Sequence, residues 1–283
     1  MKSKWRKIRM RTIVVHLLAW SVALIWMIPF LGVLNTATRP ASEVSFGWWQ
    51  LNPYHPTLDN FIKALTQPVF SISKGYVNSL IIAVPATLVP IFVAALAGYG
   101  FCRFTFPMRD YLFLSIVLLM SVPAQMVAIP VFQIMVNLDL VDNQLSLILV
   151  HTAWGLPWII LFMRNFFTAL PLEVEEAARV DGASDLKIFF RIVLPMAIPA
   201  FASAGILQFM WVWNDFFFAL ILIYTADKMP ATLLVPKLAA GQQLTDWGLL
   251  SAGSILVLIV PLALYVLLQK YYIRGMIGWT IKG

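Results

Sequence analysis

Long apolar runs separated by short polar stretches dominate this chain. They lie at about residues 12–35, 78–101, 111–136, 145–167, 192–224 and 249–269. A helix rises ~1.5 Å per residue and the hydrocarbon core of a bilayer is ~30 Å thick, so each run is long enough to cross a membrane. The pattern therefore predicts an all-α, polytopic membrane protein with six transmembrane helices.

Composition supports this class. Of the 283 residues 61% are hydrophobic and 12% are charged, whereas soluble domains carry about 25% charged residues. The single cysteine, Cys102, excludes an intramolecular disulfide and is interpreted as a packing residue. The first apolar run exceeds the ~7–15 residues of a signal-peptide core, so we expect an uncleaved signal-anchor. Cleavage at the small residues of NTATRP is the alternative.

Basic residues predict the orientation. Fifteen of the 20 Lys and Arg residues fall on the side of the N-terminus, and the other side has Arg39, Lys63, Lys74, Lys228 and Lys237. This positive-inside bias predicts that both termini are cytoplasmic. The net charge of +7 is then explained by topology and by contact with anionic lipids, and not by nucleic-acid binding.

These spans divide the chain into three parts. Residues 1–11 form a cytoplasmic N-terminal segment, 12–269 the transmembrane domain, and 270–283 a cytoplasmic tail. An external loop at 36–77 carries Trp48, Trp49 and Tyr54, side chains that suit the membrane–water interface.

A charged stretch, EEAARVDGASDLK, interrupts the apolar pattern between the fourth and fifth runs. Glutamates at its start complement the positive end of a helix dipole. Asp181-Gly182 ends that helix, because glycine tolerates a positive φ, and Ser184 can cap a second helix. Residues 171–191 are thus predicted to form two short helices joined by a glycine turn. An amphipathic hairpin that only links two spans would have the same composition.

The spacing in this stretch resembles the EAA motif of permease subunits in ABC importers. Glu176-Ala177-Ala178 is followed after three residues by Gly182, and after nine more by Ile192-Val193-Leu194-Pro195. In that family the loop forms coupling helices that dock on the ATPase subunit. The resemblance implies ATPase coupling by Glu175, Glu176, Ala177, Ala178, Asp181, Gly182, Ala183, Ile192, Leu194 and Pro195.

Further blocks are similar to carbohydrate permeases of the maltose-transporter type, and the resemblance covers most of the chain. They are GYGFCRFTFPMR, FFTALPLEVEEAARVDGAS, WVWNDFFFAL and QKYYIRGMIGWTIKG. The short external loop resembles the smaller permease, the G type. Two stretches depart from the family: NTATRP after the first span, and Ile277-Gly278-Trp279-Thr280 in the tail. The second departure leaves a tail contact with the ATPase open.

The resemblance implies a set of partners. They are two ATP-binding subunits that hold ATP and Mg, a second homologous permease, an extracytoplasmic solute-binding protein, membrane lipids and a carbohydrate or polyol substrate. The location implied is a bacterial or archaeal inner membrane. The chain has no G-x-x-x-x-G-K-[ST] run and its three histidines lack metal-ligand spacing. We therefore expect no catalysis, metal or cofactor in this chain, and hydrolysis on another polypeptide.

Asn214-Asp215 lies inside the fifth apolar run, beside Trp213. An acid at bilayer depth costs ~2.5–3.5 kcal/mol, so it should face a cavity or a partner. Aromatic faces and hydrogen-bonding groups suit sugars, which makes Gln208, Trp213, Asn214 and Asp215 candidates for the substrate pathway. Alternatively, Asn214 and Asp215 hold this helix to a neighbour or lie near the outer headgroups.

Two other classes of protein remain compatible with the residues. An ion-coupled secondary transporter would need ionisable side chains inside the membrane, for which Asp215 is a candidate. A membrane scaffold subunit would need neither an ion site nor a coupled ATPase.

Overall fold

The computed structural model of the protein describes residues 2–44, 47–239 and 246–280, with side chains described between residues 10 and 269. Every regular element in these ranges is a helix. The tail stretch Ile277-Gly278-Trp279-Thr280 falls outside the described side chains, so a contact of the tail with the ATPase stays open.

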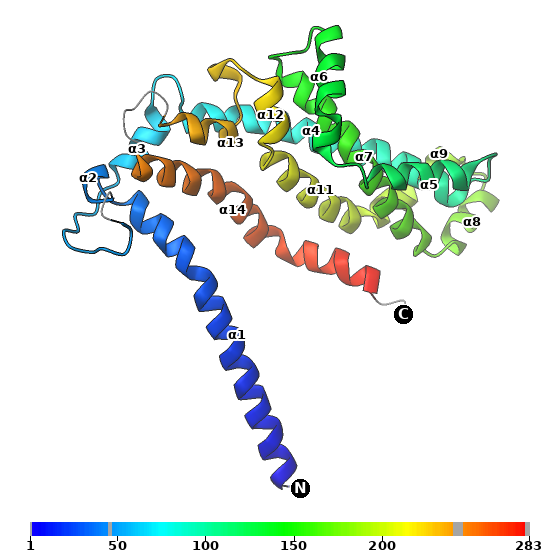
Figure 1. The fold of residues 1–283 in the computed structure, drawn as a ribbon. Coiled ribbons are helices and arrows are strands. Elements are labelled where there is room, and N and C mark those ends of the chain that lie inside the picture. The colour runs from blue at the N-terminus through cyan, green and yellow to red at the C-terminus, as the bar shows by residue number, and fades with distance from the viewer. Residues whose placement is uncertain (1, 45–46, 240–245, 281–283) are drawn as a thin grey trace. The chain divides into compact units, whose positions relative to one another are not determined.

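The elements follow one another along the chain as Figure 1 labels them. The first part has α1 (Lys2–Ala37), α2 (Ala41–Val44), α3 (Asp59–Thr66), α4 (Ile72–Arg103), α5 (Arg109–Leu119), the 3-10 turn η1 (Ala124–Val127), α6 (Ala128–Asn137) and α7 (Gln144–Thr168). The second part has α8 (Glu173–Val180), α9 (Asp185–Ile188), the π-helix η2 (Phe189–Val193), α10 (Leu194–Met196), α11 (Ile198–Trp213), α12 (Phe217–Leu222), η3 (Ala226–Lys228), α13 (Ala231–Leu234), η4 (Val235–Lys237) and α14 (Trp247–Thr280).

Four helices are long and apolar enough to cross a membrane: Met10–Ala37, Ile72–Arg103, Gln144–Thr168 and Trp247–Gln269. Two bent helix pairs raise the number to six if each pair is one span. The count of six therefore stays a prediction, while the all-helical, polytopic architecture is confirmed.

The third and fifth apolar runs are each bent in the structure. The third is broken between α5 and α6, with a bend of 97°. Pro123 lies in this break, and proline disfavours the helical conformation of the residue before it. The fifth bends by 72° between Asp185–Met196 and Ile198–Trp213. Pro199 then occupies the first turn of α11, where its missing N–H costs no hydrogen bond.

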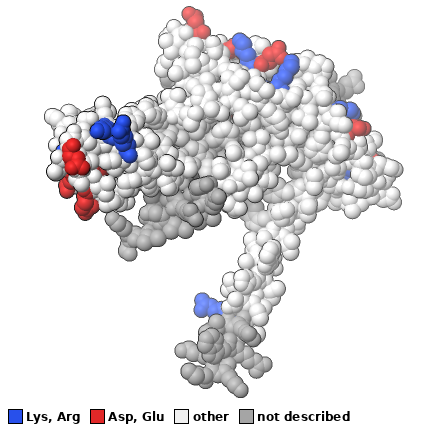
Figure 2. Space-filling view, turned by 180° about the vertical axis from the view of Figure 1, so that it is seen from behind, with Lys and Arg blue, Asp and Glu red and all other residues white. Residues whose placement is uncertain are grey.

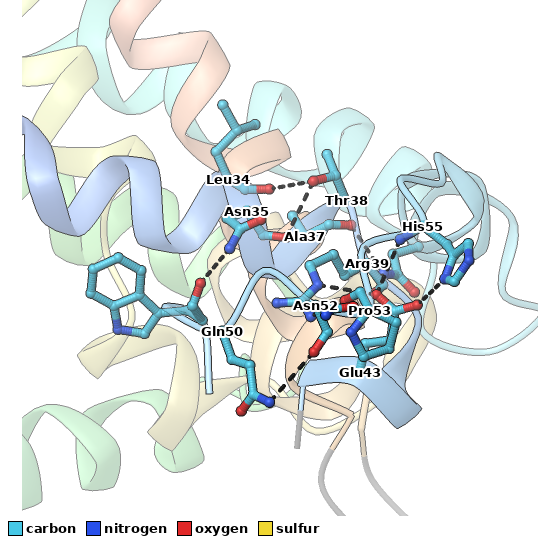
Figure 3. A network of polar contacts seen from close by, with 12 residues as sticks. Leu34, Asn35, Ala37, Thr38, Arg39, Glu43, Gln50, Asn52, Pro53 and His55 are labelled. Atoms are coloured by element: carbon cyan, nitrogen blue, oxygen red, sulfur yellow. Dashed lines mark hydrogen bonds and ion pairs between the residues drawn. The ribbon is translucent and has the colours of Figure 1, made fainter. Parts of the chain in front are cut away.

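The chain divides into two compact units, the first made of residues 1–71 and 235–256. Its polar centre is the buried guanidinium of Arg39, which donates to the Glu43 carboxylate at 3.2 Å and to the Pro53 carbonyl at 2.9 Å (Figure 3). Glu43 also contacts His55 through Nδ1 at 2.6 Å, and this hydrogen bond holds the pKa of Glu43 below its usual value. The loop after α1 is thereby ordered by a shared carboxylate.

The second unit, residues 72–234 and 257–283, is built on the pairing of α4 with α7. Small residues permit a close approach, because Ala94 and Ala95 are fully buried and a Cβ added to Gly98 would meet the Arg164 backbone nitrogen at 2.9 Å. Such contacts through small residues are typical of helices packed within a membrane. α11 completes the bundle by packing on α4.

Polar contacts tie together the segments at the end of this unit where α4 begins. Asp142, between α6 and α7, accepts hydrogen bonds from the backbone N–H groups of Tyr224 and Thr225 at 2.8 and 2.9 Å. Burial alone would raise the pKa of Asp142, but the hydrogen bonds from Thr225, Tyr224 and Lys228 outweigh it and hold that pKa well below its usual value. The α12–η3 segment is thus held against the turn before α7.

Candidate functional site: the loop between α7 and α11

α8 and α9 lie at the end of the second unit where α4 finishes, away from α12 and α13 (Figure 1). The turn between them has the predicted geometry, since Gly182 adopts φ +79°. The N–H of Gly182 donates to the Arg179 carbonyl, and that of Ala183 to the Ala178 carbonyl, both at 3.0 Å. The prediction of two short helices joined by a glycine turn is confirmed.

Ser184 takes the N-cap position of α9 with extended backbone angles, but its side chain makes no capping hydrogen bond. Ser184 thus occupies the predicted N-cap position, but the predicted side-chain hydrogen bond is absent. The turn is closed instead by a side-chain pair across it, in which Arg179 Nε donates to the Asp185 carboxylate at 3.1 Å. Both partners are exposed, so this pair contributes only a few tenths of a kcal/mol up to ~1 kcal/mol.

Glu175 faces into the protein, although it was expected among the residues that contact the ATPase. Its side chain is 2% exposed. Oε1 accepts from Nε of Arg103 at 2.9 Å and forms an ion pair with Nη2 at 2.8 Å, and Oε2 accepts from the Tyr99 hydroxyl at 3.1 Å. Two hydrogen bonds and this ion pair thus hold α8 on the end of α4.

The apolar residues of the loop share this inward face. Ile188, Phe189 and Val193 are buried in one cluster with Tyr99 and Phe167. Four residues of the expected coupling set pack against that cluster: Ala178, Ala183, Ile192 and Leu194. These four serve to seat the loop on the helices.

The opposite face of the loop is open. Of the expected coupling residues Glu176, Ala177, Asp181, Gly182 and Pro195 are exposed. A Cβ added at Gly182 would meet no atom within 4 Å. Val180 is 88% exposed and Leu186 68% exposed, on either side of the glycine turn. Figure 2 shows acidic and basic side chains gathered at this end of the unit.

Gln208 and Trp213, both candidates for the substrate pathway, are buried and bonded within the bundle. Gln208 Nε2 donates to the carbonyls of Ala86 and His151, each at 3.1 Å, while its Oε1 accepts from Trp158 Nε1 at 3.1 Å. Trp213 donates to the Val257 carbonyl at 3.2 Å and stacks on Phe209. In this structure both side chains join helices to one another.

Asn214 and Asp215 form the break between α11 and α12. Asn214 is exposed and donates to the Met210 carbonyl at 2.7 Å. Asp215 accepts from the N–H groups of Phe218 and Ala219 at 3.2 and 3.0 Å, which caps α12, and its carboxylate lies 3.3 Å from His151 Nε2. Asp215 thus has the contacts expected if it holds its helix to a neighbour. A pathway role for Asn214 and Asp215 stays a prediction.

Arg103, Tyr99 and His151 were not singled out from the sequence. Arg103 was counted only for orientation, and Tyr99 lies within an apolar run. Their importance follows from partners that are distant in sequence, such as Glu175, which is 72 residues after Arg103. No local spacing signals such a pair.

The fold defines an integral membrane protein in which a structured polar loop interrupts the apolar helices. The family of binding-protein-dependent transport system inner membrane components matches residues 86–278, and the chain belongs to this family. The family's members are non-catalytic permease subunits of ABC importers whose ATPase is a separate subunit.

Curated relatives match over almost the whole chain. A probable ABC transporter permease protein of Pyrococcus horikoshii is 53% identical, over 98% of this chain and 99% of its own length. The osmoprotective compounds uptake permease protein GgtD of Synechocystis is 41% identical, over 95% and 91%. The alpha-glucoside transport system permease protein AglG of Rhizobium meliloti is 38% identical, over 80% of this chain and 60% of the relative.

A solved structure has the same fold. It is a chain of a bacterial ABC transporter involved in the import of the acidic polysaccharide alginate. It aligns with a TM-score of 0.79 at 23% identity, over 93% of this chain and 97% of that chain.

Proposed function

We propose that this chain is the transmembrane permease subunit of an ATP-driven ABC importer for a carbohydrate or related polyol. Family membership supports the importer class. The substrate class is supported by relatives whose names refer to alpha-glucosides, diacetylchitobiose and arabinooligosaccharides.

One observation carries the coupling mechanism: the loop has an anchored face and an open face. Glu175 and the apolar residues bind it to the helices, while Val180 and Leu186 protrude among charged side chains. An exposed apolar pair with a polar surround suits the centre of a protein interface. The ATPase subunit would contact this face, and its closure on ATP binding would displace the loop.

The remaining partners complete an importer. Two ATP-binding subunits would hold ATP and Mg below the loop in the cytoplasm, and an extracytoplasmic binding protein would deliver substrate to the other side. A second, homologous permease would enclose the pathway with this chain.

Uptake by the reconstituted complex tests this function. We expect accumulation of substrate in proteoliposomes to require ATP and the binding protein, and to be unchanged by proton and sodium ionophores. Leu186→Asp should reduce uptake about tenfold or more, since it places a charge at the centre of an apolar contact. Uptake that needs no ATP and collapses with an ionophore would identify a secondary transporter instead.

A further inference from the structure

Glu175 and Arg103 form a buried ion pair that joins the loop to the longest helix of the second unit. The two side chains are 2% and 9% exposed, and their closest atoms are 2.8 Å apart. The Tyr99 hydroxyl donates to the second carboxylate oxygen at 3.1 Å. Both oxygens of Glu175 therefore have partners on α4, one turn apart.

Arg103 is fixed on its other side as well. Its Nη2 donates to the Phe167 carbonyl near the end of α7 at 2.9 Å, and its Nη1 lies 3.0 Å from Cys102 Sγ. A guanidinium with these contacts has little freedom to reorient. Glu175 is consequently held to a point where α4 and α7 meet.

The covalent route from the loop into the membrane is less direct. After α9 the chain passes through the π-helix Phe189–Val193 and then bends by 72° before α11 begins. π-helical turns are weaker points in a helix and often occur at functional sites. The covalent path from the loop to α11 therefore passes through this joint.

α4, in contrast, is one helix from Ile72 to Arg103. At its far end Asn78 donates to the carbonyls of Asp227 and Met229 at 2.8 and 2.9 Å, and a Cβ on Gly75 would lie 2.8 Å from the Ala231 backbone. α4 therefore connects the loop with the segment that follows α12, at the opposite end of the unit.

We propose that Glu175, with Arg103 and Tyr99, is the positioning link that transmits displacement of the loop to α4. This inference rests on the proposed function. Glu175 does not contact the ATPase; it makes α4 move with the loop. Burying two charges gives little net stability over an apolar pair, so the pair is suited to fixing geometry.

The test compares Glu175→Gln with wild type in the reconstituted complex. The amide keeps the size of the side chain and loses the charge that Arg103 requires. We expect the ATPase subunits to copurify as in wild type. The amount of substrate transported per ATP hydrolysed should fall about tenfold, which is within the range of interaction energies measured for residues in contact. Glu173→Gln, exposed in the first turn of the same helix, should leave this ratio unchanged.

A charge exchange separates coupling from folding. Glu175→Arg combined with Arg103→Glu restores the pair in reverse, and we expect it to recover much of the ratio lost in Glu175→Gln. A wild-type ratio in Glu175→Gln would overturn the inference, as would loss of the ATPase subunits from that variant. If the Glu175→Gln protein does not accumulate in the membrane, the test depends on the double variant. A double variant that accumulates but hydrolyses ATP without transporting substrate would also overturn the inference. Failure of wild type to show ATP-dependent uptake would instead refute the proposed function.

Discussion

Gly182→Val is expected to abolish retention of the ATPase subunits by this chain. Gly182 adopts φ +79°, a conformation that costs other residues about 1–2 kcal/mol and costs β-branched ones more. No atom of the chain lies within 4 Å of the position a Cβ would take, so the cost comes from the backbone. The backbone of the turn must therefore change conformation. Val180 and Leu186 would then no longer be held in the relative positions at which the ATPase would contact them. Affinity purification from membranes should recover at least about tenfold less ATPase, as for loss of an interface hot spot.

Gly182→Asn is the matched control for this experiment. Asparagine adopts positive φ more readily than most residues, so the turn should be preserved and most of the ATPase retained. Equal recovery of the ATPase with wild type and with Gly182→Val would show that the glycine turn does not position a docking surface.

A large loss of stability is expected from substitution of Gly98, where α4 and α7 approach one another. Gly98→Leu would bring its Cβ to 2.9 Å from the Arg164 backbone nitrogen and 3.0 Å from the Met163 Cβ. Backbone atoms cannot move aside as a flexible side chain can, so the helices must separate. Overpacking of this kind costs about 3 kcal/mol, a large share of the stability of a folded protein.

Gly100 provides the comparison on the same helix, two residues further on. A Cβ added there meets nothing within 4 Å, so we expect Gly100→Leu to accumulate and melt like wild type. The measurement is thermal unfolding in detergent, followed by size-exclusion chromatography of the fluorescently tagged chain. Equal melting temperatures for the two variants would contradict the close packing of α4 on α7.

The sequence predicted those features of the site that are determined by a single residue or a short stretch of chain. Gly182 was expected at positive φ because Asp-Gly after a short acidic helix is a stop signal, and the structure has it so. The four unbroken apolar runs likewise became helices of sufficient length. Each of these features follows from a short stretch of chain.

The 97° and 72° angles of the two bends and the inward face of the loop depend on packing. A run of apolar residues does not specify any of them. Three glutamates stand close together in α8, and only the position of Arg103 shows that Glu175 is the one that turns inward. Gln208 was a candidate for the substrate pathway because it lies about two helical turns before Asp215 and could share its face. Its hydrogen-bond partners lie on neighbouring helices, and a pathway role stays a prediction.

Cross-linking from Val180 tests the central claim most directly. In a Cys102→Ser background the chain has no other thiol, so Val180→Cys offers one reactive site, and Leu51→Cys, exposed in the loop after α1, offers a control. With a short thiol-to-amine cross-linker in native membranes, we predict a covalent adduct between Val180→Cys and the ATPase subunit and none from Leu51→Cys. Absence of that adduct from Val180→Cys, in membranes where the complex transports, would contradict the account.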